Sequence, residues 1–497
     1  MFEKIAPEEC GVRSEWVENM LDEFADLGLM MHSFILLRHG KIYAEGYYNP
    51  FGVNDKHRMY STSKSFAATA IAVLIKDGKV GIDDPIIKYF PDKTGEEVQE
   101  YLQKTTIRNL LCMQSPHCGT TYRGTWTDWI GTFFNQKANH PAGTLFSYDT
   151  SASYLLNVIV ERVTCKPFLE YLKDSFFREA GFSEDAWCIK SPDGYSWGGS
   201  GVICTSRDMA MLAQLYLDKG KINGKQVIPE WYAKEAISPM VDNNISGVTW
   251  KAGNGYGYQI WHTAKNSFTF SGMAGQYAIG FPEKDALFIC TGDNQSIVNN
   301  GYELIFPILW YSIISKMQDE PFEKNDSAVT HLKNRVNSLK CHLPKGNLTS
   351  QIEEINGQWY KLDRRIAKKI SEIMIEWKDG KGIFHYIMNG EEKQIPFGIG
   401  DYEIGEFPQT NYFGDVIGTP SGRKYRCMSA GAWPTEYQFV LRIFIIDDYF
   451  GTLTVIVGFK DDEIGICMTA AAEWFLDEYQ GITGGRKIAQ NEVSVNV

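Results

Sequence analysis

Two residues three positions apart could act together as a nucleophile and its base. Ser61 and Lys64 stand in the stretch STSK, directly before an apolar run that is typical of a buried helix. Residues i and i+3 of a helix share a face, with Cβ atoms roughly 5–6 Å apart, so Lys64 can reach the Ser61 hydroxyl if Ser61 lies in the first turn. A serine is a weak nucleophile until a base takes its proton, and burial favours the neutral, proton-accepting form of lysine. The pair therefore predicts nucleophilic serine chemistry.

The same spacing also has an ordinary explanation. Serine is a common N-cap, and a Ser-x-x-Lys spacing is expected roughly once or twice by chance in a chain of this length. Ser421 and Lys424 have this spacing too, within a Gly-containing turn of the β-rich region, where no helix would align them. The residues that accompany Ser61 and Lys64 must therefore decide between the two interpretations.

The elements expected around this pair form one α/β domain. An amphipathic helix over 16–27 precedes two strand-like runs within 32–48, which join at His39-Gly40-Lys41 as in a hairpin. Helical patterns then dominate from Ser61 to about Lys190, and strand-like runs return at 256–263, 268–281 and 286–292. A sheet that begins, is interrupted by helices and resumes predicts an α/β domain with a helical insertion.

A second, β-rich domain is expected after a charged connector. The region beyond residue 340 contains β-branched and aromatic runs joined by Asp-Gly, Asn-Gly and Asp-Asp pairs, which are typical of an antiparallel meander or a small barrel. We therefore assign residues 1–325 to the first domain, 326–344 to a linker and 345–497 to the β-rich domain. The domain boundary is expected near residue 340.

Composition excludes several classes of function. Forty-nine basic against 61 acidic residues give a formal net charge of −12 with no basic cluster, so no nucleic-acid partner is expected. No apolar run reaches the length of a membrane span, and the first residues lack the pattern of a secretory signal, so we expect a cytoplasmic protein without a membrane partner. The ten cysteines and nine histidines show no metal-ligand spacing. We expect reduced cysteines, no metal and no cofactor.

Several ordered blocks carry a resemblance to a known family. They include YSTSKSF, DGKVGIDDPIIKYFPD, PAGTLFSYDTSASYLLNVIVERV and FSGMAGQYAIGF, and they extend from about residue 5 to about 316. The chain here resembles the serine hydrolases that comprise class C β-lactamases, penicillin-binding carboxypeptidases, related esterases and D-aminopeptidases. The resemblance implies an α/β (α+β) β-lactamase/transpeptidase-like domain, in which an antiparallel sheet has a helical insertion. It also implies a lipocalin-like barrel for the C-terminal domain, an appendage that some relatives carry.

The resemblance assigns roles to three side chains. Ser61 becomes the acylated nucleophile and Lys64 its helix partner. The Tyr-x-Asn element of the family falls on Tyr148-Asp149-Thr150, which gives Tyr148 the role of general base or proton shuttle. A phenol with a pKa near 10 can serve as a base only if a cation such as Lys64 lowers its pKa, so these two residues must be judged together.

The third element of the family, a Lys-Thr-Gly or His-Thr-Gly strand, falls on Phe270-Ser271-Gly272. The backbone amide of Met273 is expected to pair with that of Ser61 to hold the oxyanion. Residues expected to bind the substrate are Thr150, Phe270, Ser271 and Gly272.

Two side chains depart from the family pattern. Phe270 replaces the basic residue that favours a substrate carboxylate, and Thr150 replaces the amide residue. The sequence therefore favours an esterase or amidase that hydrolyses a small, less anionic substrate through an acyl-enzyme. A β-lactamase or penicillin-binding activity, or a non-catalytic ligand-binding relative, stays as an alternative. A homo-oligomer is compatible with the sequence.

Overall fold

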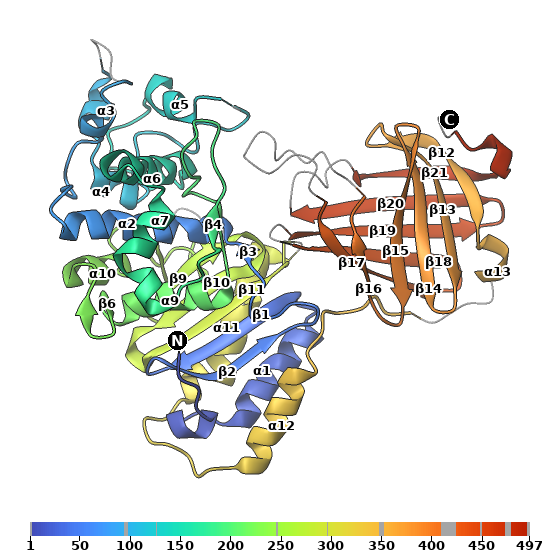
Figure 1. The fold of residues 1–497 in the computed structure, drawn as a ribbon, viewed down its shortest axis with the longest axis horizontal. Coiled ribbons are helices and arrows are strands. Elements are labelled where there is room, and N and C mark those ends of the chain that lie inside the picture. Colours follow the sequence, from blue (N-terminus) through green and yellow to red (C-terminus); the bar gives the residue numbers. More distant parts are fainter. Residues whose placement is uncertain are drawn as a thin grey trace. The chain divides into compact units, whose positions relative to one another are not determined.

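The computed structural model describes residues 2–93, 98–125, 127–244, 247–295, 297–346, 352–408, 424–447, 450–472 and 479–494. The chain divides after Lys340 into two compact units, each with its own sheet (Figure 1). The predicted fold class, an α/β β-lactamase-like domain followed by an all-β domain, is confirmed. Among the described residues, no helix is long and apolar enough to cross a membrane.

The first unit is built around an antiparallel six-stranded sheet. Its strands, in spatial order, are β2 (Lys41–Tyr47), β1 (Met31–Arg38), β11 (Ala286–Gly292), β10 (Gln276–Phe281), β9 (Ser267–Gly272) and β8 (Trp261–Thr263). The four strands β1, β9, β10 and β11 are buried at every position. Continuous burial requires cover on both faces, which explains why β1, β10 and β11 read as largely apolar runs.

Helices cover the two faces of this sheet. On one face, α1 (Ser14–Asp26) and α11 (Tyr302–Ser312) place Phe24 against Phe288 and Phe306 against Phe281. On the other face, α9 (Ser206–Leu217) packs on β1, β10 and β11 and sets Tyr216 edge-on to Phe270. The side chains of a strand alternate between faces, so neighbours along β9 point to different layers.

The helical block is inserted between β2 and β8. It comprises α2 (Ser63–Lys76), α3 (Glu100–Gln103), α4 (Ile107–Leu111), α5 (Trp129–Asn135), α6 (Thr150–Thr164), α7 (Phe168–Leu172), the π-helix η4 (Lys173–Phe177), α8 (Arg178–Ala180), α9 and α10 (Glu230–Ala236). Short strands accompany it: β3 (His57–Arg58), β4 (Trp187–Cys188) and β5 (Val202–Cys204) form one sheet, and β6 (Lys221–Ile222) and β7 (Lys225–Gln226) form a hairpin. Helix α2 is buried from Ser63 to Leu74 and packs on α6 and α7.

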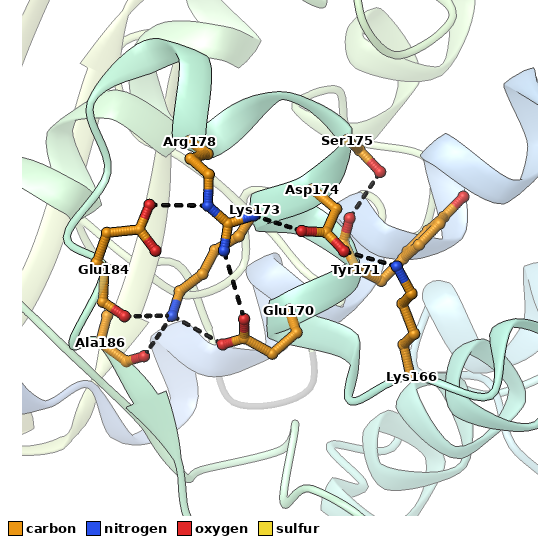
Figure 2. A network of polar contacts seen from close by, with 9 residues as sticks. All are labelled: Lys166, Glu170, Tyr171, Lys173, Asp174, Ser175, Arg178, Glu184 and Ala186. Carbon is orange, nitrogen blue, oxygen red and sulfur yellow. Dashed lines mark hydrogen bonds and ion pairs between the residues drawn. The ribbon is translucent and has the colours of Figure 1, made fainter.

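A polar network connects α7, η4 and α8 of this block to the chain that follows them (Figure 2). The buried ammonium of Lys173 donates hydrogen bonds of 2.8 Å to the Glu170 carboxylate and to the carbonyls of Glu184 and Ala186. Arg178 binds Glu184 and Asp174 beside it. A buried cation with three acceptors ties α7–η4–α8 to the chain that leads into β4. The same chain then continues to the site described below.

The segment expected as a linker, 326–344, begins with a helix. Helix α12 (Asp326–Asn337) packs on α1, with a hydrogen-bond contact of 2.7 Å between His331 and Glu18 and an ion pair of 3.0 Å between Arg335 and Asp22. Within α12, Leu332 is buried. The charged residues of this segment therefore include the solvent face of a helix in the first unit. The sequence had indicated a connector here.

The second unit is a closed barrel. Following a short helix α13 (Ile352–Ile355), its strands are β12 (Gln358–Ile366), β13 (Ile370–Lys378), β14 (Lys381–Met388), β15 (Glu391–Ile399), β16 (Glu403–Glu406), β17 (Arg426–Thr435), β18 (Gln438–Ile446), β19 (Phe450–Lys460), β20 (Glu463–Ala472) and β21 (Gly481–Ile488). Neighbouring strands are antiparallel, and a short parallel pairing of β15 with β17 closes the ring, with β16 pairing on β17. Closure removes the exposed sheet edges that such runs would otherwise leave. The specific likeness of this barrel to lipocalins stays a prediction. Ser421, which has the same spacing to a lysine as Ser61, lies outside the described residues.

Candidate active site

Ser61 lies in a 3-10 turn, η2 (Tyr60–Thr62), that runs directly into α2. The residue before it, Tyr60, has a left-handed backbone with φ of +46°, which a non-glycine residue adopts only when its surroundings hold it there. The Arg58 guanidinium stacks over the Tyr60 ring at 4.6 Å, and the Thr62 hydroxyl donates to the Gln276 carbonyl at 3.0 Å. The serine is partly exposed on a turn that is anchored on both sides.

Lys64 extends beneath this serine. Its Nζ lies 3.1 Å from the Ser61 Oγ and donates a 2.7 Å hydrogen bond to the Gly199 carbonyl. The side chain is buried, and this burial lowers the pKa of Lys64 to about 7, although the Asp149 carboxylate acts in the opposite direction. A substantial fraction of Lys64 is therefore a neutral amine at neutral pH. This amine is hydrogen-bonded to the Gly199 carbonyl and faces the Ser61 hydroxyl.

Tyr148 stands on the other side of Lys64, immediately before α6. Its neighbour Asp149 caps that helix: the carboxylate accepts from the Ser151 amide at 2.8 Å and from the Ser115 hydroxyl at 2.7 Å. The Lys64 Nζ lies 5.1 Å from the centroid of the Tyr148 ring. The buried cap thus fixes where the phenol stands relative to Lys64.

The phenol of Tyr148 stays protonated at neutral pH and so has no free lone-pair base to offer there. Loss of solvent raises the pKa of Tyr148 to about 12, an effect that the hydrogen-bonding Ser61 hydroxyl only partly offsets. Tyr148 could act as the base only if its pKa were lowered, and burial shifts the pKa of this phenol in the opposite direction. Since the pKa of Lys64 is about 7, the electrostatics favour Lys64 as the proton acceptor and leave Tyr148 protonated.

The end of strand β9 approaches the turn that carries Ser61. A Cβ atom on Gly272 would collide with the Met59 carbonyl oxygen, so only glycine allows this contact. The next residue, Met273, opens the turn η5 (Met273–Gly275), and its carbonyl accepts from the Gln276 side chain at 3.0 Å. The structure therefore brings the two segments whose amides were expected to hold an oxyanion into contact.

The other expected substrate contacts have different surroundings. The ring of Phe270 is completely buried between Tyr216 and Phe268, so position 270 belongs to the core between β9 and α9. Ser271, on the opposite face of the strand, is 8% exposed. Thr150 is partly exposed, and its backbone amide donates to the Thr120 hydroxyl at 3.0 Å. Of these, Phe270 is the least suited to touch a substrate.

A cavity of about 470 Å³ lies beside Tyr148. Aromatic and small polar side chains dominate its lining, which comprises Cys118, His140, Leu145, Phe146, Ser147, Tyr148, Asn243, Ala252 and Trp261. The Trp261 ring stacks on Tyr148 with 5.6 Å between the centroids. Trp261 thus belongs to the cavity wall. An aromatic pocket next to Tyr148 can hold the apolar part of a small substrate.

Two further participants were missed by sequence reasoning. The Gly199 carbonyl is a backbone group, which residue type does not indicate. Asp149 was the unspecified middle residue of Tyr-x-Asn, although it is a buried carboxylate near Lys64. A buried acid directly before a helical pattern is the N-cap signal that could have indicated Asp149.

Comparison with known proteins agrees with this fold. The family model Beta-lactamase matches residues 32–298, which is more than half of the chain. The chain belongs to the Beta-lactamase family. The matched residues contain Ser61, Lys64 and Tyr148 as well as the strand that ends at Gly272.

Individual relatives are distant. The 6-aminohexanoate-dimer hydrolase of Paenarthrobacter ureafaciens is 24% identical over 222 residues, covering 41% of this chain and 57% of that protein. The chain thus spans about half the length of this curated relative. A solved penicillin-binding protein homologue from Pyrococcus abyssi, described as octameric, is 12% identical and covers 95% of this chain and 99% of its own, with a TM-score of 0.49. One from Caulobacter crescentus is 17% identical, covers 56% and 90%, and has a TM-score of 0.48. With TM-scores below 0.5, the two solved structures bear on neither activity nor assembly.

Proposed function

We propose that the protein is a serine hydrolase that cleaves a small ester or amide through an acyl-enzyme on Ser61. The neutral amine of Lys64 takes the hydroxyl proton while the Ser61 Oγ attacks the carbonyl carbon of the substrate. The carbonyl oxygen becomes an oxyanion, for which the amides of Ser61 and Met273 are the donors. When the intermediate collapses, the leaving group departs with the proton, which Tyr148 relays from Lys64.

The second half-reaction restores the enzyme. Water attacks the acyl carbon and gives a proton to Lys64, the bond to the Ser61 Oγ breaks, and the oxygen regains its proton as the acid leaves. Every step uses groups of this chain and water. The single observation that carries the proposal is the 3.1 Å contact between the Lys64 Nζ and the Ser61 Oγ, combined with the pKa of about 7 for Lys64.

The choice of ester or amide has weaker support than the choice of nucleophile. The P. ureafaciens relative is named as a hydrolase of 6-aminohexanoate dimer, and this name agrees with hydrolysis of a small molecule. The aromatic cavity beside Tyr148 offers room for a small acyl group. A β-lactamase or penicillin-binding activity would use the same nucleophile, so the site does not distinguish it. Hydrolysis of nitrocefin compared with hydrolysis of nitrophenyl esters does.

Acylation of Ser61 tests the proposal directly. A fluorophosphonate probe should form a stoichiometric adduct that peptide mass spectrometry places on Ser61, and Ser61→Ala should lose both the adduct and hydrolysis of short-chain nitrophenyl esters. Ser421→Ala is the matched control because Ser421 has the same spacing to a lysine; it should react like the native protein. An intact, folded protein without an adduct would favour the alternative, a ligand-binding relative without catalysis.

We further propose that the β-rich unit acts on selectivity or on assembly of subunits. The groups assigned to catalysis, Ser61, Lys64, Tyr148 and Met273, all belong to the first unit. The barrel strands described above therefore need not contribute to the chemical step. Truncation of the chain after Lys340 tests whether the β-rich unit is dispensable for the chemical step.

A further inference from the structure

A second lysine lies beside the cavity and has no assigned role. Lys251 follows α10 in the segment that leads to β8, and its Nζ lies 4.9 Å from the centroid of the Trp261 ring and 5.9 Å from that of Tyr302. Among the described residues this Nζ makes no hydrogen bond and no ion pair within 4.0 Å, whereas the backbone amide of Lys251 donates to the Thr249 hydroxyl at 3.2 Å. The side chain is only partly exposed, so its ammonium has lost part of its hydration without gaining an anion.

The surroundings of Lys251 connect it to the candidate site. The residue after it, Ala252, lines the cavity, as does Trp261. Trp261 in turn stacks on Tyr148, whose ring lies 5.1 Å from the Lys64 Nζ. Of the two stacked rings in the cavity wall, Tyr148 therefore has the Lys64 ammonium near its face and Trp261 has that of Lys251, which adjoins the lining residue Ala252.

The nearest carboxylate does not neutralise Lys251 by direct contact. Burial lowers the pKa of Lys251 to about 8, and the field of the Glu303 carboxylate, which favours the charged form, only partly offsets this. The Glu303 oxygens themselves accept hydrogen bonds from the Thr249 hydroxyl at 2.8 Å and from the Trp250 amide at 3.1 Å. The aromatic rings beneath the ammonium stabilise it as a cation. This arrangement maintains a positive charge that is partly desolvated and available to an anion.

We propose that Lys251 is a specificity-determining residue that binds a carboxylate on the substrate at the Trp261 end of the cavity. This inference rests on the proposed function and narrows its substrate class to carboxylate-bearing esters or amides. It also revises the expectation from the sequence, in which Phe270 left the site without a complementary charge. The charge absent from position 270 is supplied from another segment, and an ion pair in a partly desolvated pocket is worth more than one at an exposed surface.

Three nitrophenyl esters of equal chain length test the charge preference. The nitrophenyl ester of hexanoate ends in a methyl group, that of adipate in a carboxylate and that of 6-aminohexanoate in an ammonium group. The native protein should show a kcat/KM for the adipate ester that is about tenfold or more above that for the hexanoate ester, and the aminohexanoate ester should be the poorest substrate. A native preference for the methyl or ammonium ester would overturn the proposal.

Substitution of Lys251 assigns the preference to this side chain. Lys251→Met should remove the advantage of the adipate ester, mainly by raising KM, and leave hexanoate turnover within about twofold, whereas Lys251→Arg should retain it. Lys265→Met is the matched control, because the Lys265 Nζ also lies over a tryptophan, 5.4 Å from the Trp310 ring, which is not part of the cavity lining. Equal loss for all three esters in Lys251→Met would show a structural role and contradict the proposal.

Binding separates this proposal from the proposed function. Calorimetric titration with adipamate, hexanamide and 6-aminohexanamide requires no turnover, and adipamate should bind the native protein about tenfold more tightly than it binds Lys251→Met. If Ser61 is not acylated but this difference is present, the hydrolase assignment fails while Lys251 keeps its role. If Ser61 is acylated and adipamate binds both proteins equally, the Lys251 proposal fails alone.

Discussion

The ammonium group of Lys64 and the carbonyl of Gly199 are separated by 135 positions in the sequence and joined by a 2.7 Å hydrogen bond. This bond uses one N–H of Lys64 and directs the remainder of the amine toward the Ser61 Oγ, 3.1 Å away. A lysine held in this way needs no rotamer search before it accepts a proton, which is the preorganisation expected of a base. The following predictions depend on this geometry.

The rate of Ser61 acylation should rise with pH through about 7. Because burial lowers the pKa of Lys64 to about 7, the amine is protonated and inactive as a base below this pH, and its neutral fraction falls about tenfold for each further pH unit. Tyr148, whose pKa is about 12, stays protonated over the same range. The rate constant of fluorophosphonate labelling, measured from pH 5 to 9, should follow one ionisation near 7.

The same profile in two variants identifies the base. Tyr148→Phe should keep the rise in labelling rate near pH 7, with lower rates throughout, because the phenol is assigned only to relaying the proton from Lys64 to the leaving group. Lys64→Arg should label negligibly at any of these pH values, since a guanidinium stays protonated. A profile centred near pH 10, or a limb that disappears in Tyr148→Phe, would instead make the phenol the proton acceptor.

Phe270→Lys should destabilise the protein without creating a β-lactam-binding charge. The ring is completely buried against Tyr216 and Phe268, so the new ammonium would be placed in the core at a cost of roughly 2–5 kcal/mol. Denaturant unfolding measures this change, and nitrocefin hydrolysis should not increase. Phe270→Leu is the control, with an expected cost of about 1–2 kcal/mol. A stable Phe270→Lys protein with faster nitrocefin turnover would return position 270 to the substrate pocket.

Gly272→Ala should slow acylation of Ser61. Its added Cβ would collide with the Met59 carbonyl oxygen and push the end of β9 away from the turn that carries the nucleophile. We expect a loss of stability of about 1–3 kcal/mol and at least a tenfold lower labelling rate, measured with the same fluorophosphonate. Gly465→Ala, whose Cβ would meet no atom within 4 Å, should behave as native. Unchanged labelling of Gly272→Ala would argue against Met273 as an oxyanion donor.

A chain that ends after Lys340 should keep Ser61 reactive toward a small acylating probe. The first unit contains every group assigned to the chemical step, and its contacts lie predominantly within itself. Selectivity among larger substrates, or the oligomeric state measured by sedimentation, should change relative to the full chain. If the truncated protein folds, as judged by circular dichroism, and Ser61 no longer reacts, then the β-rich unit supplies part of the catalytic machinery.

The sequence by itself was sufficient for those features that depend on neighbours along the chain. Ser61 and Lys64 are brought together by a local helical turn, so their spacing predicted that Lys64 can reach the Ser61 hydroxyl, and in the structure these atoms are 3.1 Å apart. The strand runs before and after the helical block likewise predicted the interrupted sheet. Helix α12 was missed although its period is local, because charged residues on its solvent face obscured the buried Leu332.

Only the tertiary structure decided the electrostatics of the site. The pKa of Lys64 depends on burial by segments far away in the chain, and its hydrogen bond depends on a backbone carbonyl that has no signature in residue type. The direction of the Phe270 ring follows from which layer packs on which face of β9. Lys251 reaches the cavity wall through a segment without helical or strand periodicity, so long-range packing alone places a second cation beside Trp261.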